Sequence, residues 1–135
     1  MILINGLTSY GSDFVEAFVD HSVPSLYTNE SGRVPIWVGI EYMAQAMAVF
    51  GGLERREKGL NPQIGFLLGT RKYNAYTQYF EKDSRVLIKA VRTYHSEENI
   101  VQFHCTITCE DILLAESNIK AIQPDNPKDV LRSIK

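Results

Sequence analysis

Apolar and polar residues alternate with a period of two along the second half of the chain. In the clearest case, residues 101–109, apolar Val101 and Phe103 alternate with polar Gln102 and His104, which predicts a half-buried antiparallel strand. Segments 85–95 and 112–122 show the same period less regularly, and 64–68 and 71–79 supply one or two further strands; polar turn residues separate these segments. We therefore predict an antiparallel sheet in this half.

The first half begins with two predicted strands, at 2–7 and 14–20, on either side of a polar turn at 9–13. A stretch without periodicity follows at 21–35. Fifteen residues are long for a connection, and loops of this length often carry function.

A long helix is predicted to begin at Pro35 and to end near Lys58, with Gly59 as its stop. Apolar residues such as Ile36 and Ile40 recur at helical spacing. The other sides are also apolar or small, so we expect the helix to be enclosed nearly all round. Charged residues return only in the last turn, at 54–58.

This order of elements predicts an α+β fold. An antiparallel sheet needs its apolar face covered. One long central helix wrapped by a curved antiparallel sheet of five or six strands meets that need, and this architecture is called the hotdog fold. We predict a single domain over residues 1–124 and a polar C-terminal tail at 125–135, which could form a short helix.

Composition and charge narrow the class of protein. The chain has 135 residues, of which 44% are hydrophobic and 22% charged, as in a globular domain. The formal net charge of −2 gives no indication of binding to nucleic acid or to an anionic membrane. Residues 36–53 approach the length of a membrane span, but they include Glu41, Gln45 and three glycines, so we expect no membrane span.

The sequence favours a cytoplasmic protein. Met1 is followed directly by apolar residues, without the basic region of a secretory signal. Cys105 and Cys109 lie four apart in a predicted strand, which separates their Cα atoms by about 13 Å, too far for a disulfide. Buried free thiols are typical of a reducing compartment. The three histidines fit no metal-ligand spacing, and we expect neither metal nor cofactor.

The segment around Glu41 resembles the central helix of the β-hydroxyacyl-acyl-carrier-protein dehydratases. Residues 34–46 read VPIWVGIEYMAQA, and the family motif runs Pro-Gly-x-x-x-x-Glu-x-Met-Ala-Gln. The likeness is strongest to the subgroup encoded with aryl-polyene and related lipid synthases, whose helix begins Pro-Ala-Trp-Val-Gly-x-Glu-x-Met-Ala-Gln. GFLLG at 65–69 and ILIN at 2–5 are similar to two of the family's strands. The resemblance implies a hotdog dimer that removes water from a 3-hydroxyacyl thioester of acyl carrier protein or coenzyme A.

Two departures from the family pattern concern histidines. Standard members place a catalytic histidine fourteen residues before the glutamate, within Gly-His-Phe-Pro-Gly, and here that position is Tyr27. Members also carry a Pro-His-containing segment just before the first strand, whereas this sequence begins at Met1, inside that strand. A segment preceding Met1 could have carried a functional histidine.

Glu41 is the predicted acid–base group. Dehydration needs a base for the C2 proton, an acid for the C3 hydroxyl, and donors for the developing enolate oxygen. Apolar surroundings favour the neutral form of a carboxyl group, so we expect burial to raise the pKa of Glu41. The alternative is a structural acid that caps a buried network or pairs with an arginine across a dimer.

His21 and Tyr27 are the candidates for the second catalytic group. His21 shares strand parity with Val19 and could point inward, and Tyr27 takes the position of the family's histidine. Backbone N–H groups at the helix start could polarise the thioester carbonyl. The substrate-binding candidates lie near that start, one turn beyond Glu41, or in the following strand: Trp37, Val38, Gly39, Gln45 and Phe66. Core packing explains the aromatic candidates equally well.

The first functional interpretation is a 3-hydroxyacyl-acyl-carrier-protein dehydratase, or a dehydratase-like subunit, of a fatty-acid or polyene-type lipid pathway. It would be a homodimer or a heterodimer with another hotdog subunit. An acyl-thioester hydrolase of the same fold, with Glu41 activating water, is the first alternative. The second alternative is a non-catalytic partner that completes the site of another hotdog subunit, which the absent loop histidine favours.

Overall fold

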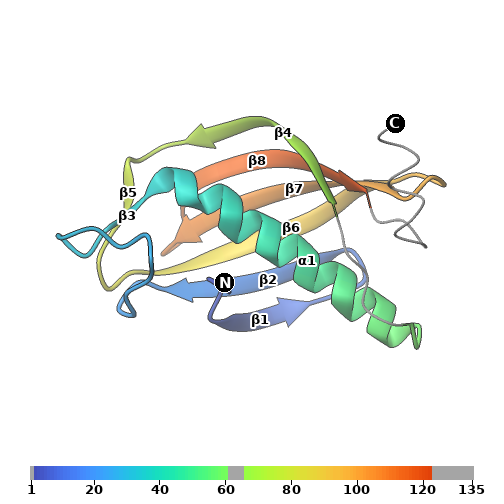
Figure 1. The fold of residues 1–135 in the computed structure, drawn as a ribbon, viewed down its shortest axis with the longest axis horizontal. Helices are drawn as coiled ribbons and strands as arrows, with labels where there is room; N and C mark the ends of the chain where they lie inside the picture. The colour runs from blue at the N-terminus through green and yellow to red at the C-terminus, as the bar shows by residue number, and fades with distance from the viewer. Residues whose placement is uncertain (1, 61–65, 123–135) are drawn as a thin grey trace.

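The protein folds as a curved antiparallel sheet around one long helix (Figure 1). The computed structural model describes residues 2–60 and 66–122. In chain order the elements are β1 (Gly6–Tyr10), β2 (Phe14–Asp20), β3 (Val34–Pro35), the 3₁₀-helix η1 (Ile36–Val38), α1 (Gly39–Glu57), β4 (Phe66–Ala75), β5 (Tyr79–Phe80), β6 (Arg85–His95), β7 (Ile100–Cys109) and β8 (Ile112–Ile122).

The main sheet has six strands in the order β1-β2-β6-β7-β8-β4, and every neighbouring pair is antiparallel. The period of two predicted at 101–109 is confirmed, because Val101, Phe103 and Cys105 are buried while the residues between them are partly exposed. The short strands β3 and β5 form a second, two-stranded sheet. This small sheet lies beside the start of the helix (Figure 1).

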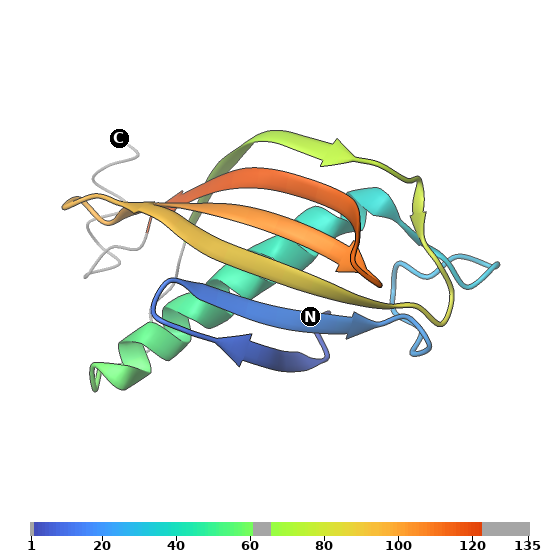
Figure 2. The ribbon, with the colours of Figure 1, turned by 180° about the vertical axis from the view of Figure 1, so that it is seen from behind.

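Helix α1 lies across the concave face of the main sheet, whose convex face is seen in Figure 2. Its inward side buries Tyr42, Met43 and Phe50 against the inner face of the strands. The helix ends where the sequence predicts, because Gly59 adopts φ +70°, a conformation that glycine tolerates without strain. The Leu60 N–H then donates to the carbonyl of Arg55 at 2.8 Å, which closes the last turn.

The expectation that the helix is enclosed nearly all round is wrong for the single chain. Trp37 at the helix start is 60% exposed, and Glu41 and Ala48 are also exposed. By length and apolar character, residues 36–57 are comparable to a membrane span, yet only 44% of the most apolar window is buried within the fold. One side of the helix belongs to the core, and the outer side is left open in the single chain.

Several strand boundaries differ from the prediction. The first strand begins at Gly6, not at residue 2, because the N–H groups of Leu3 and Ile4 donate to the Gln45 side chain instead of a neighbouring strand. Of the one or two strands predicted over 64–68 and 71–79, the structure has one long strand, β4, which ends at Ala75, and the short β5 after it. Residues 64 and 65 and the tail at 125–135 lie outside the described residues.

The six-stranded sheet around one helix is the hotdog architecture, and the fold prediction is confirmed. Both cysteines are free thiols, and Cys105 is fully buried. Burial raises the pKa of the Cys105 thiol to about 12, which leaves it unreactive near neutral pH.

Candidate functional site

Glu41 lies in the first turn of α1, on the outer side of the helix. Trp37 lies four residues earlier, one turn before it on the same face. The carboxylate is exposed in the single chain, so the apolar enclosure expected from its neighbours in sequence is absent here. The apolar residues that surround Glu41 in the sequence face the sheet on the other side of the helix.

Gln45 holds the Glu41 carboxylate from the next turn of the helix. Its side-chain Nε2 donates to Oε1 of Glu41 at 3.2 Å. Its Oε1 accepts the backbone N–H of Leu3 at 2.7 Å and that of Ile4 at 3.3 Å. Of the predicted site residues, Glu41, Gln45 and Trp37 are therefore brought onto one face of the helix.

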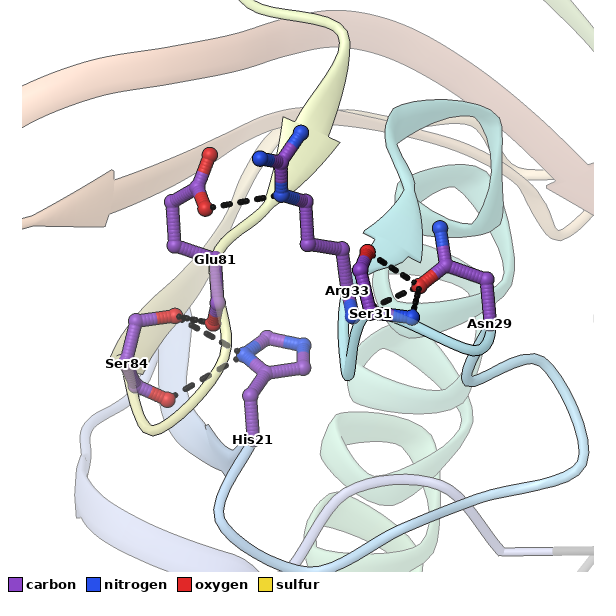
Figure 3. Close-up of polar contacts among 6 residues, drawn as sticks. All are labelled: His21, Asn29, Ser31, Arg33, Glu81 and Ser84. Atoms are coloured by element: carbon purple, nitrogen blue, oxygen red, sulfur yellow. Dashed lines mark hydrogen bonds and ion pairs between the residues drawn. The ribbon is translucent and has the colours of Figure 1, made fainter.

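His21 points inward, at the end of β2, and is only 6% exposed. Its Nδ1 lies 3.2 Å from the backbone carbonyl oxygen of Ser84 and 3.2 Å from the Ser84 hydroxyl (Figure 3). Its Nε2 lies 3.0 Å from the hydroxyl of Tyr42, and its ring stacks on Phe80 with 5.2 Å between the centroids. Because a carbonyl oxygen only accepts, Nδ1 carries the hydrogen and Nε2 accepts from Tyr42.

Burial sets the protonation states of His21 and Tyr42. It lowers the pKa of His21, although the hydrogen bond to the Ser84 backbone and the charge of Asp20 act in the opposite direction. It raises the pKa of Tyr42 to about 12. Near neutral pH, His21 is therefore a neutral acceptor and Tyr42 a neutral donor, which is the arrangement that the distances require.

His21 and Glu41 occupy different sides of the helix. Tyr42 follows Glu41 directly, but successive helical residues are turned by about 100°, so Tyr42 points to the core while Glu41 points outward. Within residues 2–60 and 66–122, no hydrogen bond joins His21 to Glu41. A cavity of about 340 Å³ opens beside the pair, with His21 and Tyr42 among its lining residues and exposed Ile2, Val23 and Leu26 also around it.

Tyr27 packs against Trp37. The ring centroids are 5.6 Å apart and the planes meet at 81°, an edge-to-face contact. Tyr27 is half-buried. Its ring therefore lies at the helix start, one turn before Glu41, where it supports the exposed Trp37.

The loop before the helix is ordered by its own polar groups, although its sequence shows no period. The Oδ1 atom of Asn29 accepts from the N–H groups of Ser31 and Arg33 and from the Ser31 hydroxyl (Figure 3). Arg33 forms an ion pair with Glu81 at 3.2 Å, which joins the loop to the end of β5. This loop fixes the position of the helix start.

The helix start itself is tightly packed. Val38 and Gly39 are buried, and a Cβ atom at Gly39 would collide with the hydroxyl of Tyr73. That hydroxyl donates to the carbonyl of Ile36 at 2.6 Å. The N–H of Gly39 already donates to carbonyl oxygens of the 3₁₀ turn, Ile36 and Trp37. Glycine is therefore needed here for the close approach of β4 to the helix.

Two residues of this region were not singled out from the sequence: Tyr73 and Ser84. Each contacts a partner distant in the chain, and no local pattern signals such a contact. Phe66 begins β4 opposite Ile122, and its side chain is outside the part of the chain that the structure describes. Among the described residues, no group of three His, Cys, Asp or Glu side chains could hold a metal ion.

Comparison with known proteins places the chain among hotdog proteins. Residues 1–132 match the family described as ApeP-like: ApeP dehydratase. The structure superposes on a chain of the dehydratase heterocomplex ApeI:P from Xenorhabdus doucetiae with a TM-score of 0.87 and 25% identity, covering 99% of this chain and 90% of that chain.

More distant structures share the fold only. A thioesterase from Haemophilus influenzae, HI1161, has a TM-score of 0.66 and 17% identity, covering 90% of this chain and 80% of that chain. A Streptococcus mutans protein bound to acetyl coenzyme A has a TM-score of 0.68 and 11% identity, covering 91% of each chain. No curated protein matched the sequence.

Proposed function

Because this chain belongs to the ApeP-like dehydratase family, we propose that it is a subunit of a hotdog dehydratase that removes water from a 3-hydroxyacyl thioester. One observation carries the proposal: Glu41, the single charged residue of the apolar segment 36–53, lies on the outer face of the helix, and Gln45 in the next turn holds it by a hydrogen bond. Glu41 is the acid–base group of this reaction.

The chemistry requires two proton movements. The C2–H bond breaks and its proton goes to a base, while the C3–O bond breaks and the hydroxyl leaves as water after taking a proton from an acid. The electron pair of the C2–H bond forms the new C2–C3 double bond. An exposed carboxylate suits the base when a partner subunit closes over it, because exclusion of water strengthens its interactions with the substrate.

We propose that a second hotdog subunit covers the outer face of the helix. More than half of the helix's most apolar window is open in the single chain, which is unfavourable in water. The solved relative from Xenorhabdus doucetiae is a heterocomplex of dehydratase subunits, which supports a heterodimer. A homodimer would cover the same face and is the alternative result when association of the subunits is measured.

The second catalytic group is proposed to come from that partner. His21 has both ring nitrogens engaged by Ser84 and Tyr42, and Tyr27 packs on Trp37. Neither side chain makes a hydrogen bond with Glu41 among the described residues. The thioester carbonyl would lie near the helix start, where Trp37 is exposed, and its carrier would be acyl carrier protein or coenzyme A.

The test compares the wild-type protein with Glu41→Gln, alone and mixed with the partner hotdog subunit. Enoyl thioester and free thiol are followed separately, starting from 3-hydroxyacyl thioesters. We expect enoyl product from the wild type and a loss of at least 100-fold in Glu41→Gln. Glu98→Gln makes the same change at an exposed turn position and should keep full activity. Normal turnover by Glu41→Gln would refute the proposed role.

Thioester hydrolysis is the second candidate, because Glu41 is open to water in the single chain and could activate a water molecule. The same assay discriminates between the two. Free thiol without enoyl product, lost in Glu41→Gln, would favour hydrolysis. Activity of the mixture that Glu41→Gln leaves intact would favour a non-catalytic partner.

A further inference from the structure

The convex face of the main sheet carries apolar side chains where strands β2 and β6 meet. Phe14 and Phe18 of β2 point to this face, with Val91 and Leu87 of β6 directly opposite them. All four are half-buried, whereas the alternate residues of β2, such as Val15, are fully buried on the concave side. Within residues 2–60 and 66–122, no helix or second sheet lies over this part of the convex face (Figure 2).

The neighbouring strand β7 shows what a solvated face of the same sheet contains. Its outward residues are all polar: Gln102, His104, Thr106 and Thr108. An antiparallel sheet with one face in water normally has polar residues at the outward positions. The apolar residues of β2 and β6 are therefore a local feature of this face, and apolar area left in water favours a covering surface.

The two phenylalanine rings lie close to the sheet and leave this face flat. A Cβ atom added at Gly6 would come within 2.9 Å of the Phe18 ring. One added at Gly11 would come within 2.6 Å of the Phe14 ring. Both rings thus lie against glycines of β1 and its following turn. A flat face can approach another sheet to the spacing of about 10 Å at which sheets pack.

An acid and a base stand side by side between the apolar residues. Glu16 of β2 and Lys89 of β6 are directly opposite each other, yet the described part of the chain contains no ion pair of either. Glu16 instead accepts from the Thr8 hydroxyl at 2.7 Å. The ammonium group of Lys89 lies 5.1 Å from the centroid of the Phe14 ring. Both charges therefore remain available to a second molecule.

We propose that this β2–β6 face binds the same face of a second copy of the chain. The face consists of three facing pairs from the two strands: Phe14 and Val91, Glu16 and Lys89, Phe18 and Leu87. A two-fold axis between β2 and β6 would lay β2 of one copy over β6 of the other, because a symmetric interface pairs residue i with j and j with i. Glu16 of each copy then meets Lys89 of the other, with apolar pairs on either side.

The charges of this face favour a second copy over a different partner. A face of one sign would call for an oppositely charged surface, whereas adjacent charges of both signs are complementary to themselves under a two-fold rotation. The hotdog subunit proposed above is assigned to the outer side of α1, and α1 lies on the concave side of the sheet. Both associations can therefore exist at once, and this inference does not depend on the role of Glu41.

Two charge reversals, Glu16→Lys and Lys89→Glu, test the pairing across the axis. Each puts like charges in contact when a variant meets itself, and each should raise the dissociation constant for self-association at least about tenfold. An equimolar mixture of the two variants brings opposite charges together at both contacts, so it should associate within about threefold of the wild type. Mixing could not restore an ion pair that forms inside one chain.

Sedimentation velocity over a range of concentrations measures the association, on the full chain or on its complex with the partner subunit. The melting temperature shows whether each variant is folded. Lys120→Glu, on the outer face of β8 opposite Gln102, makes the same reversal away from the β2–β6 face and should associate as the wild type does. Should a reversal not fold, Val91→Thr keeps the side-chain shape and should weaken self-association about threefold or more.

Three results would overturn the proposal. The first is a wild type in which two copies of this chain do not associate, and the second is self-association that neither reversal weakens. The third is a mixture of the two reversals that associates no better than each variant alone. If Lys89→Glu instead releases the hotdog partner subunit, this face belongs to that subunit. Enzymatic activity is not the readout, so none of these results bears on Glu41.

Discussion

The hydroxyl of Tyr42 in α1 donates to Nε2 of His21 at the end of β2, across 3.0 Å in the buried interior. His21 in turn donates to Ser84, just before β6. Three elements that begin at different points of the chain are joined by this chain of hydrogen bonds. Glu41, the residue before Tyr42, is exposed on the other side of the same helical turn.

The free energy of unfolding should depend on pH because the pKa of His21 is lowered in the folded state. Because burial holds its pKa below 6.5 in the folded state, the unfolded chain takes up a proton first as the pH falls. The free energy of unfolding should therefore decrease between about pH 7 and pH 5, by at most about 1.4 kcal/mol per pH unit. Denaturant unfolding over this range checks it. His21→Gln should flatten this slope, whereas His95→Gln, at an exposed position, should keep it.

Tyr42→Phe should destabilise the fold. The substitution removes the only donor to Nε2 of His21 in the described part of the chain and leaves a buried acceptor unsatisfied. We expect a loss of about 1–3 kcal/mol in the free energy of unfolding, measured by denaturant titration. Tyr94→Phe, at a 57% exposed position, removes the same hydroxyl in water and should change stability by less than about 0.5 kcal/mol. Equal effects of the two variants would contradict the buried hydrogen bond.

Two glycines of the helix should respond in opposite directions to alanine. At Gly39 a Cβ atom would collide with the Tyr73 hydroxyl, so Gly39→Ala should destabilise the fold by about 1–3 kcal/mol. At Gly52 no atom lies within 4 Å of the added Cβ, and alanine should stabilise the helix by up to about 1 kcal/mol. Thermal unfolding of both variants checks this prediction, which fails if Gly39→Ala is as stable as the wild type.

Trp37→Glu should weaken the association with the proposed partner subunit. Trp37 is 60% exposed on the face left open by the single chain, and a charge there would be desolvated when the face is covered. We expect the dissociation constant to rise at least about tenfold, measured by calorimetry or analytical ultracentrifugation. Tyr94→Glu, similarly exposed near the end of β6, should bind as the wild type does. Unchanged binding by Trp37→Glu would place the partner elsewhere.

Much of the fold could be predicted from local pattern. The alternation around Val101 and Phe103 gave a strand buried on one face, and the helical spacing from Ile36 onward gave the helix, because periodicity reports which residues share a face. Gly59 marked the helix end, because its φ of +70° needs no tertiary contact. The boundary of β1 was missed, because the N–H groups of Leu3 and Ile4 are taken by Gln45, a partner more than 40 residues away.

The candidate site, too, has some features that the sequence indicates and others that only the tertiary structure shows. The sequence by itself determined that a single acid, Glu41, stands within an apolar helix, and that Gln45 lies one turn beyond it. Only the tertiary structure decided that Glu41 faces outward, that His21 bonds to Tyr42 and Ser84, and that Tyr73 fills the space beside Gly39. The physical reason is that a one-dimensional pattern states which side of an element is apolar, whereas the sheet's curvature and the long-range contacts decide which side is covered.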